Sequence, residues 1–197
     1  MPWYSEFYNG LLDHKYASLG IQYYLLARVG SRFPFNPASG NLYHLGFELL
    51  LKSYLKNKHS SIDLKSDFGH DLVKLWGGFK SETLADGLDK YDSIFKNLDT
   101  WENARYLELK GGRDIHTIEI LKGSAPEEYL DKIMSSDIHS LEYFKVYIDD
   151  MDKLFNVFFS TLKVPPEELL KNPDFVWGRN LYEKGNKYSL LGKQSNV

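Results

Sequence analysis

Phe47-Glu48-Leu49-Leu50-Leu51-Lys52-Ser53-Tyr54-Leu55 is the centre of the strongest predicted helix, which spans Leu42 to Lys58. Apolar side chains occupy most of the circumference of this helix, so we expect it to be largely buried. The exception is a narrow polar stripe at steps of four residues, made of His44, Glu48, Lys52 and Lys56. Residues four apart lie on adjacent turns of one face, and Glu48 precedes Lys52 in the favourable order for an ion pair.

The helix that comes before it is predicted to span Leu11 to Phe33, because apolar residues recur there at steps of three and four. Its predicted core-facing stripe is Leu12, Tyr16, Leu19, Tyr23, Leu26 and Val29 or Gly30. Between the two helices, the segment from Pro34 to Asn41 contains two prolines and a glycine, which predicts a loop. Asn41 is then expected to cap the second helix.

Helical periodicity returns several times after residue 58. We expect a short helix that starts at Gly69-His70-Asp71-Leu72 and ends at Gly77-Gly78, followed by a helix from Ser81 to Leu98. Another helix begins at Pro126, since proline and acidic residues are favoured in a first turn. The last long helix is predicted to follow Asp137 and to run to Leu162, with an apolar seam at Ile138, Leu141, Phe144, Ile148, Met151, Phe155, Phe158 and Leu162.

The only β-like signal lies at residues 104–109 and 116–121, where apolar and polar residues partly alternate around a Gly-Gly pair. The predicted fold class is therefore mostly α: an antiparallel helical bundle with a small inserted β-hairpin (about residues 104–121) and an extended C-terminal arm. We expect the bundle to comprise residues 1–172. Residues 173–197, which are rich in Gly, Asn and Lys, would form the arm and pack on the bundle or on a partner.

Composition excludes several classes of function. The chain has 197 residues, no cysteine and a formal net charge of −3. A disulfide framework, thiol catalysis and cysteine zinc sites are thereby ruled out. No signal peptide and no apolar run of roughly 20 residues is present, so we expect a soluble, cytoplasmic protein with no membrane contact. Interleaved charges without a basic face argue against a duplex DNA partner.

Familiar catalytic motifs are absent as well. The sequence has no phosphate-binding Gly-rich loop, no Gly-x-Ser-x-Gly and no His-Glu-x-x-His. Asp149, Asp150 and Asp152 form an acidic cluster, which we interpret as a solvated helix face because only some of the three share a side. The prediction is that no metal and no cofactor is bound.

Four pieces of sequence nevertheless occur in a meaningful order. They are Tyr23-Tyr24-Leu25-Leu26-Ala27, the stretch at residues 47–55, Phe68-Gly69-His70-Asp71-Leu72-Val73-Lys74-Leu75 and Asn103-Ala104-Arg105-Tyr106. Together they resemble the HEPN superfamily (higher eukaryotes and prokaryotes nucleotide-binding domain), over roughly residues 11 to 106. The resemblance implies a helical bundle that commonly forms homodimers and, in many members, cleaves RNA without metal through an Arg and a His separated by four to six residues.

The chain departs from that family pattern at its closest Arg/His pair. Arg113 and His116 have only two residues between them. The leading hypothesis is therefore a non-catalytic bundle that acts by binding a nucleotide, RNA or a partner protein. The alternative is a metal-independent RNA-cleaving toxin or defence ribonuclease, in which Arg would hold the phosphate and His would move protons. A third hypothesis is a purely structural interaction module with no small-molecule site.

The candidate residues follow from the first two of these hypotheses. Arg113 and His116 are the catalytic candidates, and the binding candidates are His44, Glu48, Lys52, His70, Asp71 and Arg105. Each also has a plainer structural interpretation, such as an ion pair, a helix-start residue or an exposed hairpin residue. The expected partners are a second copy of the chain, RNA or a nucleotide, and a nucleotidyltransferase-type antitoxin.

Overall fold

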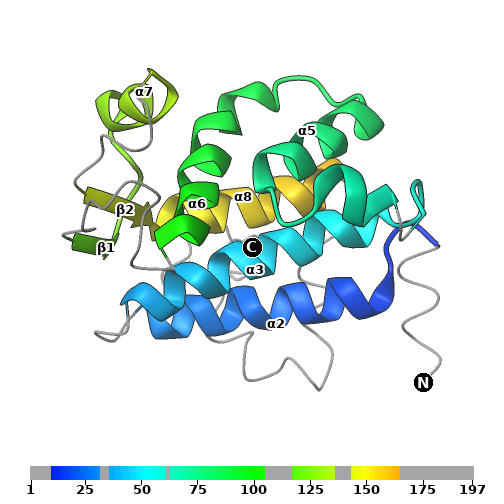
Figure 1. Cartoon of the computed structure of the whole chain (residues 1–197), viewed down its shortest axis with the longest axis horizontal. Coiled ribbons are helices and arrows are strands. Elements are labelled where there is room, and N and C mark those ends of the chain that lie inside the picture. Colours follow the sequence, from blue (N-terminus) through cyan, green and yellow to red (C-terminus); the bar gives the residue numbers. More distant parts are fainter. Residues whose placement is uncertain (1–9, 32–35, 61–62, 105–116, 136–142, 165–197) are drawn as a thin grey trace, which may run out of the picture.

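The computed structural model of the chain describes residues 10–31, 36–60, 63–104, 117–135 and 143–164 (Figure 1). Within these residues the chain is mostly helical, as predicted, with one small sheet. The elements in order are α2 (His14–Gly30), α3 (Asn36–Leu55), the π-helical turn η1 (Leu64–Phe68), α5 (Leu72–Thr83), the 3-10 turn η2 (Asp89–Tyr91), α6 (Asp92–Ala104), β1 (Thr117–Leu121), α7 (Glu127–Ser135), β2 (Tyr143–Tyr147) and α8 (Ile148–Thr161). The predicted arm at 173–197 lies outside the described residues.

Helix α2 buries a different face from the predicted one. Asp13 caps it by accepting hydrogen bonds from the backbone N–H groups of Lys15 and Tyr16. Its buried residues are Ala17, Gly20, Ile21, Tyr24, Leu25, Ala27 and Arg28, whereas Leu19 and Leu26 of the predicted stripe are exposed. The prediction was wrong because the buried face uses small residues, which give little hydrophobic signal but allow close approach to α3.

Helices α2 and α3 run side by side in opposite directions. A Cβ atom added at Gly20 would lie 3.0 Å from the carbonyl oxygen of Gly46, and one added at Gly46 would lie 3.0 Å from the backbone nitrogen of Tyr24. The helices therefore touch backbone to backbone at these two glycines, where any side chain would force them apart. Farther along the pair, Gly30 of α2 faces Ser39 of α3.

Helix α3 starts earlier than predicted. It begins at Asn36, so the second half of the predicted loop is helical and Asn41 is not its N-cap. Pro37 lies in the first turn of α3, where backbone N–H groups have no partner within the helix. A proline, which lacks this N–H, is therefore tolerated there. The expectation that α3 is largely buried is confirmed, since most of its residues from Tyr43 to Leu55 are buried.

Two predicted boundaries between residues 69 and 98 were also wrong. Helix α5 continues through Gly77-Gly78, because Gly78 packs against the ring of Phe68, where a Cβ would come within 2.7 Å. The predicted helix from Ser81 to Leu98 is divided. Leu84 adopts a left-handed conformation (φ 49°) and ends α5, and the chain re-forms a helix at η2 and α6.

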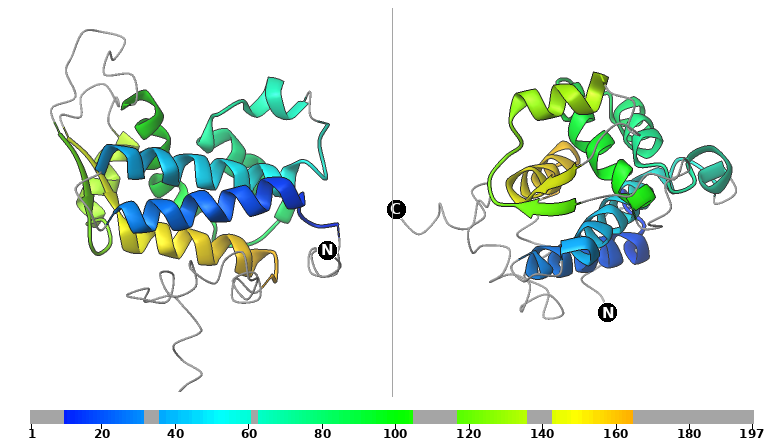
Figure 2. Two further views of the ribbon diagram at one scale, coloured as in Figure 1. Left: turned by 90° about the horizontal axis from the view of Figure 1, so that it is seen from below. Right: turned by 60° about the vertical axis from the view of Figure 1, so that its left-hand side comes forward.

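The small sheet is parallel, which corrects the predicted hairpin. β1 pairs with β2 in the register Thr117↔Tyr143 to Leu121↔Tyr147, and α7 connects the two strands. Residues 105–116, where the other strand and the turn were predicted, lie outside the described residues. The segment that supplies β2 was expected to be helical, because its apolar residues also fit the seam of the last long helix. Figure 2 shows the sheet and α7 at one end of the bundle.

Helix α8 is shorter than predicted and its acidic start is not solvated. Asp149, Asp150 and Asp152 are all buried, which overturns the interpretation as an exposed face. Asp150 accepts a hydrogen bond from the backbone N–H of Ala125 at 2.8 Å. Burial raises the pKa of Asp150, and the hydrogen bonds from Ala125 and Ser124 offset only part of this rise. Acidic residues are favoured in this position by the positive end of the helix dipole.

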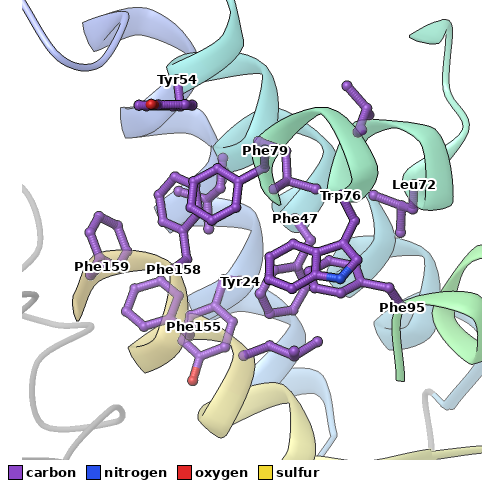
Figure 3. Packing of buried hydrophobic residues seen from close by; sticks show 14 of the residues in the cluster. Tyr24, Phe47, Tyr54, Leu72, Trp76, Phe79, Phe95, Phe155, Phe158 and Phe159 are labelled. Atoms are coloured by element: carbon purple, nitrogen blue, oxygen red, sulfur yellow. The ribbon is translucent and has the colours of Figure 1, made fainter. Parts of the chain in front are cut away.

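The core contains stacked aromatic rings from five helices, α2, α3, α5, α6 and α8 (Figure 3). Tyr24 of α2 stacks on Phe155 of α8 with ring centroids 4.0 Å apart, and Trp76 of α5 stacks on Phe95 of α6 at 4.3 Å. Phe47 of α3 lies edge-on to both Tyr24 and Phe95, so it joins the two stacks. Such ring pairs stabilise a core beyond their buried area, by about 0.5–1.5 kcal/mol each. Within the described residues, no helix is long and apolar enough to cross a membrane.

Candidate functional site

The polar stripe of α3 divides into two parts. His44, Glu48 and Lys52 lie toward α5 and α6, and we call these three residues the α3 stripe. Lys56, one turn farther on, binds Asp13 at the start of α2 instead, with 2.8 Å between Nζ and Oδ2. The predicted run of four is therefore one site of three residues plus a separate, partly exposed ion pair.

Glu48 is the centre of the site. Its carboxylate is buried, and its Oε1 lies 2.7 Å from Nζ of Lys52 and 3.0 Å from Nδ1 of His70. An ionised carboxylate only accepts hydrogen bonds, so we assign the proton of the His70 ring to Nδ1. Nε2 is then the nitrogen that has no part in this bond. The side chain of His70 is 72% exposed, so the site reaches the surface at this ring.

The loop between α3 and α5 places His70 over Glu48. It contains the π-helical turn η1, and Gly69 follows with a φ of 55°, a left-handed conformation that favours glycine. Asp71 then caps α5 by accepting a hydrogen bond from the backbone N–H of Lys74 at 2.8 Å. The Gly-His-Asp-Leu order thus has a local explanation: a glycine for the turn, a histidine for Glu48 and an aspartate for the cap.

Asp99 of α6 closes the site from the other side. Its Oδ1 accepts a hydrogen bond from the backbone N–H of Leu72 at 2.7 Å, so it holds the N-terminus of α5. The ring of His44 is fully buried between two carboxylates. Its Nε2 lies 3.8 Å from Oδ1 of Asp99, and its Nδ1 lies 4.0 Å from Oε2 of Glu48. A continuous row of polar side chains therefore links α3, α5 and α6.

The charges of this site nearly balance. Glu48, Asp71 and Asp99 supply three carboxylates, whereas Lys52 and Lys74 supply two ammonium groups, which leaves a formal charge of −1 with neutral histidines. The backbone N–H groups of Leu72 and Lys74 at the start of α5 are occupied by carboxylates. An anion would thus find neither a surplus of positive charge nor these two amides free.

A second buried polar cluster joins α2 to α8. Asp152 accepts hydrogen bonds from Nε and Nη2 of Arg28, at 2.7 and 2.8 Å, and from the hydroxyl of Tyr24. Burial alone would lower the pKa of Arg28, but the hydrogen bonds and the charge of Asp152 raise it above the ordinary value. The guanidinium therefore stays charged inside the core. A two-pronged pair of this kind fixes direction as well as distance, so it sets how α8 lies against α2.

The structure brings together five of the candidates: His44, Glu48, Lys52, His70 and Asp71. Arg105, Arg113 and His116 lie outside the described residues, so their roles stay predictions. Sequence analysis missed Asp99, and no local pattern distinguishes it. It also missed Arg28, for which a signal exists: Arg28 is the only charged residue between Tyr16 and Gly30.

Among the described residues, no group of three or more histidine and acidic side chains has the arrangement of a metal site. The chain matches no model of a known protein family, and neither the curated proteins nor the solved structures provide a significant match.

Proposed function

We propose that this protein is a HEPN-like helical bundle that acts by binding a protein partner and carries out no catalysis. The observation that carries the proposal is the closure of the α3 stripe. His44 is completely buried, Glu48 is nearly so, and the side chain of Lys52 is 13% exposed. A substrate could therefore touch His70 but could not reach the groups behind it. These groups serve to hold the start of α5 against α3.

Charge favours a protein over RNA or a nucleotide as the ligand. RNA and nucleotides bind where positive groups neutralise phosphates. At this site both ammonium groups already have carboxylate partners within 3.5 Å, Lys52 with Glu48 and Lys74 with Asp71. The homodimer and the nucleotidyltransferase-type antitoxin suggested by the family resemblance both belong to the protein class that the proposal favours.

An RNA cleavage assay tests the absence of catalysis. The full chain should leave an end-labelled, unstructured RNA intact, with magnesium or with a chelator, over hours at stoichiometric concentration. Cleavage that disappears in His116→Ala would overturn the proposal in favour of the ribonuclease alternative. Cleavage that disappears in His70→Ala would overturn it by placing the chemistry at Glu48 and His70.

The matched control is His59→Ala, which removes a half-buried histidine that is not part of the α3 stripe and whose Nε2 lies 3.5 Å from Oε1 of Glu82. Each variant is first compared with the parent by circular dichroism, so that a loss of fold is not read as a loss of activity. Activity that survives in all three variants and does not co-elute with the protein identifies a contaminating nuclease.

A further inference from the structure

The outward side of α5 combines exposed apolar side chains with an exposed glycine. Val73 is 44% exposed, Leu84 is 85% exposed, and Gly77 lies between them at the surface of the helix. Steps of four and seven residues put these three positions along one side of α5, and we call them the outer face of α5. The face begins three residues after the exposed His70. In Figure 1, α5 lies above α3, on the side of the bundle away from α2.

The packing of the described residues does not require a glycine at position 77. A Cβ atom added at Gly77 would meet none of their atoms within 4 Å, whereas one added at Gly78 would lie 2.7 Å from the ring of Phe68. Glycine in the interior of a helix lowers stability relative to other residues. Gly77 therefore weakens α5 without serving its packing, and the missing side chain leaves the helix backbone open to another molecule.

Leu84 departs from local preferences in two ways. Its φ of 49° is left-handed, a conformation that glycine adopts easily and that strains a residue with a side chain. Its N–H donates to the carbonyl oxygen of Lys80 at the end of α5, a position where glycine is the usual residue. The leucine side chain is nevertheless almost entirely exposed, so burial in the fold does not compensate for this strain. Contact with another molecule would explain both features.

Charge indicates the chemistry of that molecule. Residues 80–92 contain two lysines and four acidic residues, which gives a formal charge of −2. Nζ of Lys80 lies 2.6 Å from Oδ1 of Asp89 and 2.7 Å from Oδ1 of Asp92, so this cation is already paired. The C-terminal end of a helix adds partial negative charge. Exposed apolar side chains beside an acidic surface are complementary to a basic amphipathic segment, whereas RNA would be repelled.

We propose that the outer face of α5 binds a basic amphipathic helix of a protein partner. The apolar side of that helix would lie on Val73 and Leu84, and its lysine or arginine residues would face the acidic end of α5. This inference rests on the proposed function and specifies the chemistry of the partner. Val73 and Leu84 are separated by about 16 Å along the axis of α5, so three turns of a partner helix cover the face. Gly77 leaves room between them for a large side chain of the partner.

Fluorescence anisotropy with two synthetic helical peptides of about 18 residues tests the proposal on the full chain. One peptide carries leucines on one side and lysines on the other, and the second has glutamates in place of the lysines. The lysine peptide should bind at least about tenfold more tightly than the glutamate peptide. Leu84→Gly should weaken binding of the lysine peptide at least about tenfold. The matched control is Met134→Ala, which removes a 50% exposed apolar side chain on α7 and should bind like the parent.

Thermal melts separate binding from folding. Leu84→Gly should raise the melting temperature by about 1–4 °C, because it relieves the left-handed strain. Gly77→Gln should raise it by a similar amount, since glutamine favours the helix, and should weaken binding of the lysine peptide because its side chain fills the space above the backbone. Both variants should thus be more stable than the parent and bind more weakly, a combination that loss of fold does not produce.

The proposal would be overturned if the two peptides bound equally, if neither bound, or if Leu84→Gly bound the lysine peptide as well as Met134→Ala does. A lower melting temperature of Leu84→Gly would also overturn it, because Leu84 would then serve the fold. Sedimentation of the parent and of Leu84→Gly, alone and with labelled RNA, covers other occupants. A dimer or an RNA complex that the variant abolishes would assign the face to a second copy or to RNA. The cleavage assay uses neither α5 variant, so the proposed function and this inference can fail separately.

Discussion

Asp152 and Glu48 are both buried carboxylates that bind a cation, but the first is enclosed in the core and the second leads to the surface. Asp152 and Arg28 form an ion pair in which both side chains are almost fully buried. Asp152 also accepts a hydrogen bond from the hydroxyl of Tyr24. Glu48 holds Lys52, but its other partner is His70, which is mostly exposed. The Arg28–Asp152 pair therefore fixes architecture, while the Glu48 site stabilises a loop and presents one ring to solvent.

The largest effect is expected at the enclosed pair. Asp152→Ala should lower the free energy of unfolding by about 3–5 kcal/mol, because it leaves the Arg28 guanidinium buried without its carboxylate. Urea denaturation of the variant and the parent measures this loss. The control is Asp89→Ala, which removes an 87% exposed partner of Lys80 and should cost less than about 1 kcal/mol. Equal losses in the two variants would show that the pair adds nothing to the architecture.

A smaller loss is expected at the site that leads to the surface. Glu48→Ala should cost about 2–3 kcal/mol, less than Asp152→Ala, because the freed Lys52 and His70 have access to water. Lys56→Ala, one pair farther along the same helix, should cost under about 1 kcal/mol since both partners there are partly exposed. Denaturation midpoints that coincide for these two variants would show that Glu48 is merely solvated.

The smallest effect should appear at Asp13 and depend on pH. Burial alone would raise the pKa of Asp13, but hydrogen bonds from Lys56 and from the first turn of α2 lower it below the ordinary 3.8. Because the pKa of Asp13 is lower in the folded protein than the ordinary value, its ionised carboxylate stabilises the fold above pH 3.8. This stabilisation is lost as the pH falls through the lowered pKa.

Asp13→Asn retains a capping side chain but removes the charge. It should therefore be less stable than the parent at pH 7, by less than about 1 kcal/mol, and the difference should shrink as the pH falls below 3.8 through the lowered pKa of Asp13. Thermal melts of both proteins from pH 7 to pH 2.5 give the comparison. A difference that stays constant across this range would show that the charge of Asp13 is not what stabilises the start of α2.

The α3 stripe could be predicted because its geometry is local. Steps of four residues on one helix put His44, Glu48 and Lys52 together whatever the rest of the fold does. The Gly-His-Asp-Leu signal placed a helix start near His70, and the structure adds that this start lies against Glu48. Short-range rules thus identified most of the site.

What could not be predicted depends on residues far apart in the chain. Arg28 and Asp152 are separated by 124 positions, and no periodicity links them. The parallel pairing of β1 with β2 joins segments on either side of α7, and apolar spacing at β2 also fitted a helix. The buried face of α2 was misassigned because glycine and alanine are part of that face, while Leu19 and Leu26 are exposed.

The central claim is that the α3 stripe is closed to a substrate, with the ring of His44 fully buried and the ring of His70 exposed. Diethyl pyrocarbonate, which acylates accessible neutral imidazoles, tests it directly when the modified residues are identified by peptide mass spectrometry. The account predicts rapid modification of His70, whose side chain is 72% exposed, and protection of His44, which is 0% exposed, until urea unfolds the protein. Modification of His44 in the folded protein at a rate similar to that of His70 would contradict the account, because the stripe would then be open to a substrate.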